Sequence, residues 1–219
     1  MKEIYCNDGN SVSSEFILNE LHFKVGKSIF LINSWLSKKR IFKNPYIKIV
    51  KIKKVFPNKI FVNINERKKF IKILNSNGNF FIDDEGFVLE FLHNEKERCE
   101  LQESFDVDKC WLTSVLGLEL EPVIGKKISP KNVECVEFLT CVKALERKNV
   151  LNKIVYIDLS DLKDIKLNYM NKIFVTIGDT SNIPYKIRFM CQILEDYISG
   201  ESGELAFLNN DFYFKIIYE

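Results

Sequence analysis

A proline turn between two runs rich in β-branched residues constrains the fold of this chain more than any other feature. The runs are residues 46–56 and 59–67, and Pro57-Asn58 joins them. Val, Ile and Phe favour extended strands, and a short turn between two such runs favours an antiparallel pairing. The sequence therefore predicts a β-hairpin here.

The two arms of this hairpin differ in their pattern of apolar residues. In the second arm Ile60, Val62 and Ile64 alternate with polar or aromatic positions, as expected for a strand buried on one face. In the first arm Ile49 is followed directly by Val50, so the apolar side changes there. We expect a bulge, or a strand that is buried in part on both faces.

Two short helices are expected before the hairpin. Ser13 or Ser14 can cap the first, and Asn33 or Ser34 can cap the second, because their side-chain oxygens accept from the first unpaired N–H groups of a helix. Pro45 ends the second, since the residue before a proline avoids helical geometry. With a short strand near the start of the chain, the order is strand, helix, helix, hairpin.

The rest of the chain has a different pattern of predicted elements, with many short strand candidates and two amphipathic helices. The helices are expected to start near Ser129-Pro130 and near Pro184, with proline at a favoured first helical position. This mixture, without a regular βαβ order, predicts an α+β fold, with one domain at 1–69 and a larger mixed β-sheet domain at 70–219. The strand candidates are 79–83, 86–92, 153–159, 165–170, 172–178, 204–209 and 211–219.

Charge is distributed very unevenly along the chain. Residues 38–72 contain 13 of the 32 Lys and Arg but one of the 30 acidic residues, so this window carries +12 and the remainder −10. No apolar run reaches the roughly 20 residues that a membrane helix needs. The six cysteines show no CxxC spacing, and we expect reduced, mostly buried thiols.

Recognisable catalytic or ligand-binding patterns are missing from the sequence. The two histidines lie far from metal-ligand spacing, and no Walker, dinucleotide or nucleophile-elbow motif occurs. The carboxylates at 83–85 and at 158–164 are interpreted as solvated turns, and 178–181 as a plain loop. We therefore expect no catalytic residue, no metal and no cofactor, which argues against an enzyme.

The hairpin and its surroundings resemble a known family. A basic segment with Asn-Pro leads into a strand, a Phe-Pro-Asn turn and a closing Glu-Arg pair, as in the POTRA module of the bacterial cell-division proteins FtsQ/DivIB. The POTRA signature consists chiefly of Asn44, Pro45, Pro57, Glu66 and Arg67, and the matching positions between them are Ile47, Phe56, Asn58, Ile60, Val62 and Ile64.

The resemblance continues beyond this module, through residues 80–91, 120–125, 171–194 and 203–219. Two features depart from it. Ala206 stands where relatives usually carry Asp, and the membrane helix expected before the module is absent from this chain. The resemblance implies a single-pass protein of the cell membrane, enriched at the division septum, with this region outside the cytoplasm.

The resemblance also implies a function without catalysis. Members of the family act as scaffolds of the divisome, bind FtsB/DivIC and FtsL, and help to regulate the septal peptidoglycan synthases. In them the last strands of the β domain accept a partner strand at the sheet edge. The corresponding residues here are Asp211, Phe212, Tyr213, Phe214, Lys215, Ile216, Ile217 and Tyr218.

Two readings of this last strand stay open from the residues alone. Its exposed backbone groups could pair with a strand of another protein, or its own domain could cover it. Alternative identities are another POTRA-bearing envelope assembly or transport protein and, ranked last, a nucleic-acid-binding module. Against the last, the aromatic residues are not interleaved with the lysines along the sequence as in single-strand binders, and no groove-reading motif is seen.

The lysines of the hairpin also have two readings. They form a basic face that contacts an anionic membrane surface or a partner, or they are solvated residues that keep a sheet edge from aggregating. Nucleic acid is not expected as a partner. The residues concerned are Lys48, Lys51, Lys53, Lys54 and Lys59.

Overall fold

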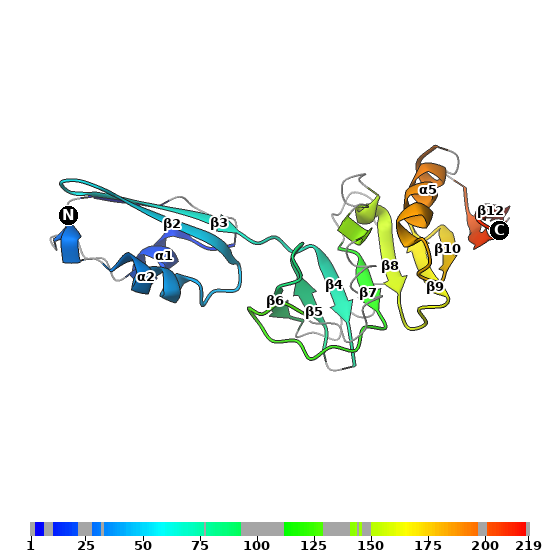
Figure 1. The fold of residues 1–219 in the computed structure, drawn as a ribbon, viewed down its shortest axis with the longest axis horizontal. Helices are drawn as coiled ribbons and strands as arrows, with labels where there is room; N and C mark the ends of the chain where they lie inside the picture. Colours follow the sequence, from blue (N-terminus) through cyan, green and yellow to red (C-terminus); the bar gives the residue numbers. More distant parts are fainter. Residues whose placement is uncertain are drawn as a thin grey trace.

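The computed structural model shows an elongated molecule with two lobes that follow each other along its long axis (Figure 1). The N-terminal lobe holds the first hairpin, and the last strand lies at the opposite end of the molecule. The structure describes residues 3–6, 11–21, 28–31, 33–76, 78–92, 112–128, 141–143, 145, 150–196 and 201–217.

The N-terminal lobe is a three-stranded sheet covered by two short helices. The sheet order is β1-β3-β2, with β1 parallel and β2 antiparallel to β3. Its apolar core includes Ile17 and Leu21 of the first helix and Ile60 and Val62 of β3. The elements are β1 (Glu3–Cys6), α1 (Ser14–Leu21), the 3-10 turn η1 (Ile29–Leu31), α2 (Ser34–Ile41), β2 (Ile47–Val55) and β3 (Lys59–Glu66).

Local chemistry explains where these elements begin and change. The Asn33 side chain accepts from the backbone N–H of Trp35 and Leu36, both at 3.1 Å, and so caps α2. The register of β2 against β3 shifts between Ile47 and Ile49. The predicted helix cap is confirmed. A bulge is present as predicted, but it lies before Ile49 and not between Ile49 and Val50, so that Ile47 is buried and Ile49 is exposed.

The C-terminal lobe is built on one nine-stranded sheet, in the order β12-β11-β10-β9-β8-β7-β4-β5-β6. Pairing is parallel between β4 and β7, β7 and β8, and β10 and β11, and antiparallel elsewhere. The strands are β4 (Ile71–Leu74), β5 (Phe80–Ile82), β6 (Val88–Phe91), β7 (Ser114–Leu116), β8 (Ile154–Asp158), β9 (Ile165–Tyr169), β10 (Ile173–Gly178), β11 (Gly203–Leu208) and β12 (Asp211–Ile216).

Helix α5 (Ile183–Asp196) covers one face of this sheet beside β9 and β10 (Figure 1). It buries Ile187, Met190 and Leu194, the stripe that the helical spacing predicted. A short 3-10 turn, η2 (Leu151–Lys153), precedes β8. The helix expected from Ser129-Pro130 lies largely outside the described residues.

Each lobe has its own hydrophobic core. Ile64 is the last residue of the first core and Phe70 is the first residue of the second, so the proposed division at 69/70 lies between them. The mixed α+β class is confirmed. Within the described ranges no helix is long and apolar enough to cross a membrane.

Candidate functional site

Strand β12 forms one end of the nine-stranded sheet. Of the eight residues expected at an edge strand, Asp211 to Ile216 form β12, Ile217 follows it directly, and Tyr218 lies outside the described residues. Within the part of the chain that the structure describes, no strand lies beyond β12.

The direction of the backbone groups in β12 follows from one hydrogen bond. The Ile217 N–H donates to the Ser202 carbonyl at 3.0 Å, and these two residues face each other in the β11–β12 register. Because bonded and non-bonded pairs alternate in an antiparallel ladder, Tyr213 and Lys215 direct their N–H and C=O groups toward β11. The intervening residues direct theirs away from the sheet; they are Phe212, Phe214 and Ile216.

One of these outward donors already has a partner within the chain. The Phe212 N–H donates to the Asp211 carboxylate at 2.8 Å. The outward N–H groups of Phe214 and Ile216 lie farther along the strand, where the register with β11 is unbroken. This half of the edge is the part best suited to pairing with another strand.

The side chains of β12 alternate between two environments. Phe212 and Phe214 pack against the core of the C-terminal lobe, whereas Tyr213 is 54% exposed on the opposite face. Ile216 lies on the core side but near the end of the strand, and it is 40% exposed. An added strand would therefore meet one face lined by aromatic rings and one open to solvent.

Aromatic contacts hold the start of β12 against α5. The Phe212 ring makes edge-to-face contacts with Phe189 of α5 and with Phe207 of β11, at centroid distances of 5.7 and 5.0 Å. The two-residue turn Asn209-Asn210 has positive φ at both positions, which suits a tight hairpin with the twist of its strands.

The backbones of β11 and β12 lie close together at the other end of β12, and this contact fixes its position. A Cβ added to Gly203 would lie 2.3 Å from the Lys215 carbonyl oxygen and 2.9 Å from the Phe214 ring. Gly203 faces Ile216 in the register, at a non-bonded position, where the two backbones come closest. Only glycine fits this position without moving β12.

A buried lysine supports the same region. Lys186 of α5 is 5% exposed and donates from Nζ to the Asp179 carboxylate at 2.7 Å and to its backbone carbonyl at 2.9 Å. The Nζ lies 4.8 Å from the centre of the Phe207 ring. The hydrogen bond from Lys186, with a second from Ser181, lowers the pKa of Asp179 to about 2. The charge of Lys186 is thus compensated within the described structure.

A second cluster joins the two lobes, and sequence reasoning missed it. Arg67 donates to Asp83 at 2.5 Å and to Glu85 at 2.8 Å, and its guanidinium lies 3.7 Å from the centre of the Phe87 ring. Lys48 lies 3.2 Å from the same Glu85 carboxylate. Hydrogen bonds from Arg67 and Lys48 lower the pKa of Glu85. We call this cluster the domain junction.

The expectation that residues 83–85 form a solvated turn is wrong for Asp83. Its side chain is fully buried, and Oδ1 accepts from the N–H groups of Glu85 and Phe87 at 3.0 and 2.7 Å. A carboxylate needs such partners when it leaves water, and Arg67 supplies the opposite charge. The sequence contains one signal for this ion pair: the acidic turn at residues 83–85 follows shortly after the window of residues 38–72, which carries +12.

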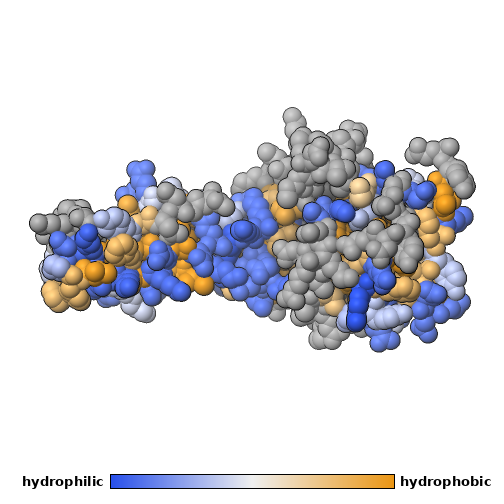
Figure 2. Space-filling view, turned by 90° about the horizontal axis from the view of Figure 1, so that it is seen from above, coloured by the Kyte–Doolittle hydropathy of each residue, from blue (hydrophilic) through white to orange (hydrophobic). Residues whose placement is uncertain are grey.

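Tyr46 and Lys69 add further contacts to the domain junction, both to the carboxylate of Glu90. The Tyr46 hydroxyl donates to Glu90 at 2.5 Å, and Lys69 pairs with the other oxygen of the same carboxylate. Burial, followed by the hydrogen bond to Glu90, raises the pKa of Tyr46. The narrow region between the two lobes, which we call the waist, is correspondingly hydrophilic in Figure 2.

The other POTRA signature residues have local structural roles. Asn44 Oδ1 accepts from the Tyr46 N–H at 2.9 Å in the turn that also contains Pro45. Pro57 lies in the turn between β2 and β3. Glu66 accepts from the N–H groups of Ser11 and Val12 at 2.9 and 2.8 Å, which ties β3 to the segment before α1.

The five hairpin lysines do not share one face. Lys48 belongs to the domain junction. Lys51, Lys53 and Lys59 lie on the side of the sheet away from the helices, since they alternate with positions that face the buried residues Ile60 and Val62. Lys53 is diagonal to Lys59 across the two strands. Lys54 lies at a position of β2 that points to the opposite side of the sheet from Lys51 and Lys53.

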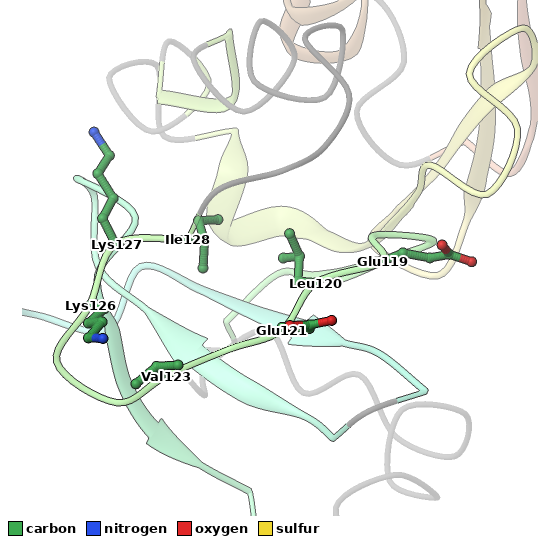
Figure 3. A pocket seen from close by; sticks show the side chains of 7 residues that line it. All are labelled: Glu119, Leu120, Glu121, Val123, Lys126, Lys127 and Ile128. Carbon is green, nitrogen blue, oxygen red and sulfur yellow. The ribbon is translucent and has the colours of Figure 1, made fainter.

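A small hollow lies in the loop of residues 119–128, in the C-terminal lobe (Figure 3). Its volume is about 310 Å³, and it is lined by both acidic and basic residues together with Leu120, Val123 and Ile128. Among the described residues no group of three or more His, Cys, Asp or Glu could hold a metal ion. Nothing in this loop favours one ligand over another.

Comparison with known proteins agrees with the resemblance drawn from the sequence. Residues 2–67 match the family model described as "POTRA domain, FtsQ-type". The chain is 29% identical over 189 residues to the cell division protein DivIB of Clostridium botulinum strain Hall, covering 84% of this chain and 68% of that protein. It is 26% identical over 214 residues to DivIB of Clostridium tetani, covering 97% and 76%. The predicted resemblance is confirmed.

Proposed function

We propose that this DivIB/FtsQ-type cell division protein is a non-catalytic scaffold of the divisome that accepts a strand of a partner protein at β12. Its relatives are named cell division proteins, and its N-terminal lobe has the FtsQ-type POTRA domain. The observation that carries the proposal is the outward direction of the backbone groups of Phe214 and Ile216 at the end of a sheet.

The proposed partners are division proteins of the FtsB/DivIC and FtsL types. Through them the scaffold would influence the septal peptidoglycan synthases. The proposed location is the outer face of the cytoplasmic membrane at the division septum. These assignments extend to this chain what the family resemblance implies.

Strand addition suits the chemistry of this edge. Each new backbone hydrogen bond contributes about 1 kcal/mol net, and a partner strand would satisfy donors and acceptors that otherwise face water. The backbone provides affinity, whereas alternate side chains provide specificity. Phe212 and Phe214 would line one face of the added strand, and Tyr213 and Lys215 the other.

The test compares two proline substitutions at adjacent positions. Ile216→Pro removes an outward N–H, so the β11–β12 ladder should survive while the affinity for a partner falls by about 100-fold, the equivalent of about 3 kcal/mol. Lys215→Pro removes an N–H that faces β11, so it should destabilise the lobe itself by about 3 kcal/mol. Calorimetric titration with the extracytoplasmic region of a DivIC-type partner, and urea unfolding, measure the two effects.

Ile216→Ala is the control for the lost side chain. It retains the N–H, and we expect its affinity to stay within about fivefold of the wild type. Unchanged partner affinity in a folded Ile216→Pro variant would show that this edge is not the binding site. Equal loss in the Ala and Pro variants would assign binding to the side chain instead of the backbone.

A further inference from the structure

The sheet of the POTRA domain has one face that its helices do not cover. Ile60, Val62 and Ile64 of β3 are buried beneath α1 and α2. Alternate residues therefore point to the other side, which we call the outer face. At these positions the strands carry Tyr5 of β1, Lys59 and Phe61 of β3, and Lys51, Lys53 and Val55 of β2.

Aromatic rings and lysines are interleaved on the outer face. Tyr5 and Phe61 stack with a centroid distance of 4.9 Å and an interplanar angle of 10°. Lys59 Nζ lies 5.8 Å from the centre of the Tyr5 ring, and Lys53 faces Phe61 across the strands. Tyr5 and Phe61 nevertheless remain 46% and 36% exposed.

The tip of the hairpin adds a purely apolar element. Phe56 precedes Pro57 in the turn and is 58% exposed, and Phe30 of η1 is 76% exposed. Their ring centroids lie 5.0 Å apart, so the two rings form one protruding patch. In Figure 2 hydrophobic and hydrophilic residues are mixed over this end of the molecule, unlike the hydrophilic waist.

The charge of this surface is positive. Within the described residues Lys51 and Lys53 carry no ion pair, and Lys59 adds a third cation on the same face. In the backbone register Lys59 pairs with Glu3 of β1. The surrounding window of 38–72 carries +12, so the surface is complementary to an extended anionic layer.

We propose that the outer face and the Phe30–Phe56 tip bind the surface of an anionic phospholipid bilayer. Lysines attract the anionic headgroups without requiring a fixed geometry, and their aliphatic stems can lie along the interface. Phe30 and Phe56 have no polar atom to place in water, and the boundary between headgroups and acyl chains suits such rings.

The same geometry disfavours single-stranded nucleic acid. Base stacking needs an aromatic face that is open, and the contact between Tyr5 and Phe61 covers one face of each ring. The outer face spans three strands, so it presents a broad surface to a bilayer.

Lipid binding at this end leaves the proposed partner edge accessible. In Figure 1 the hairpin of β2 and β3 and the strand β12 lie at opposite ends of the long axis. The bilayer proposal does not rest on strand addition, and the two can be tested separately. Ile216→Pro should lower the affinity for a partner by the same factor of about 100 and leave lipid binding unchanged.

The experiment measures co-sedimentation of the protein with large vesicles. One set contains phosphatidylglycerol and phosphatidylcholine in a one-to-two ratio, and the other contains phosphatidylcholine alone. We expect binding to the anionic vesicles only. A triple Lys→Gln variant at Lys51, Lys53 and Lys59 should lose at least about 20-fold in partition, since each lysine near such a surface contributes about fivefold.

Matched controls separate local from global effects. A triple Lys→Gln variant at Lys126, Lys163 and Lys172, exposed lysines of the C-terminal lobe, makes the same change in net charge and should stay within about twofold. Phe56→Ser should weaken partition by about tenfold even at low salt, because the lost contribution is apolar. Circular dichroism checks that each variant is folded.

Three results of the vesicle experiment, and one of a competition experiment, would overturn the proposal. The first three are no preference for anionic over neutral vesicles, equal losses in the two lysine triples, and unchanged binding in a folded Phe56→Ser variant. Competition by soluble inorganic polyphosphate that abolishes binding equally in wild type and Phe56→Ser would assign a polyanion site in place of a bilayer.

Discussion

Strands β2 and β12 both form an end of their sheet, yet they protect that edge very differently. β2 carries four lysines among its nine residues and has a bulge near its start, whereas β12 carries one lysine among six and keeps an unbroken register with β11. Lysines and bulges are the usual means by which proteins discourage pairing at a sheet edge. One edge is therefore guarded, and the other is open.

Each lobe is therefore suited to contact another molecule through a different part of its sheet. On β2 the backbone edge is protected, and the sheet presents its outer face with lysines and aromatic rings instead. On β12 the edge is available, and the aromatic residues Phe212 and Phe214 are turned inward against the core. The first lobe is suited to contact through side chains and the second to contact through the backbone.

The largest effect on this comparison is expected from Gly203→Ala. The added Cβ would overlap the Lys215 carbonyl and the Phe214 ring, so β12 must move away from β11. Overpacking of this kind costs about 1–3 kcal/mol. We expect a loss of that size in urea unfolding, together with faster amide exchange of β12.

Gly125→Ala is the control for backbone strain. Gly125 has a φ of 76°, but a Cβ there would meet nothing within 4 Å, so its cost of about 1 kcal/mol comes from conformation alone. Gly125→Ala should leave amide exchange in β12 unchanged. If Gly203→Ala behaved in the same way, close packing would not be what positions β12.

The next effect tests whether lysines account for the contrast between the edges. Replacing Tyr213 and Ile216 together by Lys gives β12 the composition of a guarded edge. Because both side chains are exposed, stability should change by no more than about 0.5 kcal/mol at each site. Partner affinity should fall about tenfold in calorimetric titration.

The reverse exchange should open the guarded edge. With Lys51→Thr and Lys53→Thr, β2 keeps its strand propensity but loses two cations. We expect concentration-dependent self-association in sedimentation velocity. A variant that stays monomeric would indicate that the bulge alone protects β2.

The smallest effect concerns the ion pair behind the open edge. Lys186 lowers the pKa of Asp179 to about 2, below its value in the unfolded chain. Asp179 therefore stabilises the fold fully above about pH 4, and this contribution is lost as the pH falls toward 2. The stability difference between wild type and Asp179→Asn should shrink over that range, whereas a constant difference would contradict the assignment.

The sequence predicted elements well where local chemistry decides them. The turn at Pro57 and the cap at Asn33 depend on neighbours within a few residues, and both were found; the bulge in β2 was also found, although before Ile49 and not after it. All seven strand candidates of the C-terminal lobe also became strands. β4 and β7 were missed, because Ile71–Leu74 continues a lysine-rich segment and Ser114–Leu116 is too short to show a period.

The sheet order and the domain junction could not be read from the sequence. Placing β7 between β4 and β8 requires contacts between residues far apart in the chain. The burial of Asp83 likewise depends on Arg67 reaching across from the other lobe. Gly203 lies in the recognised closing segment, but its need to be glycine becomes visible only when β12 lies against it.

The domain junction has a mechanical consequence. Arg67 contacts Asp83 and Glu85 through its guanidinium nitrogens and the Phe87 ring through its guanidinium face, and it lies in the segment that connects β3 to β4. Bending between the two lobes would have to break these contacts together. The domain junction therefore resists changes in the angle between the lobes.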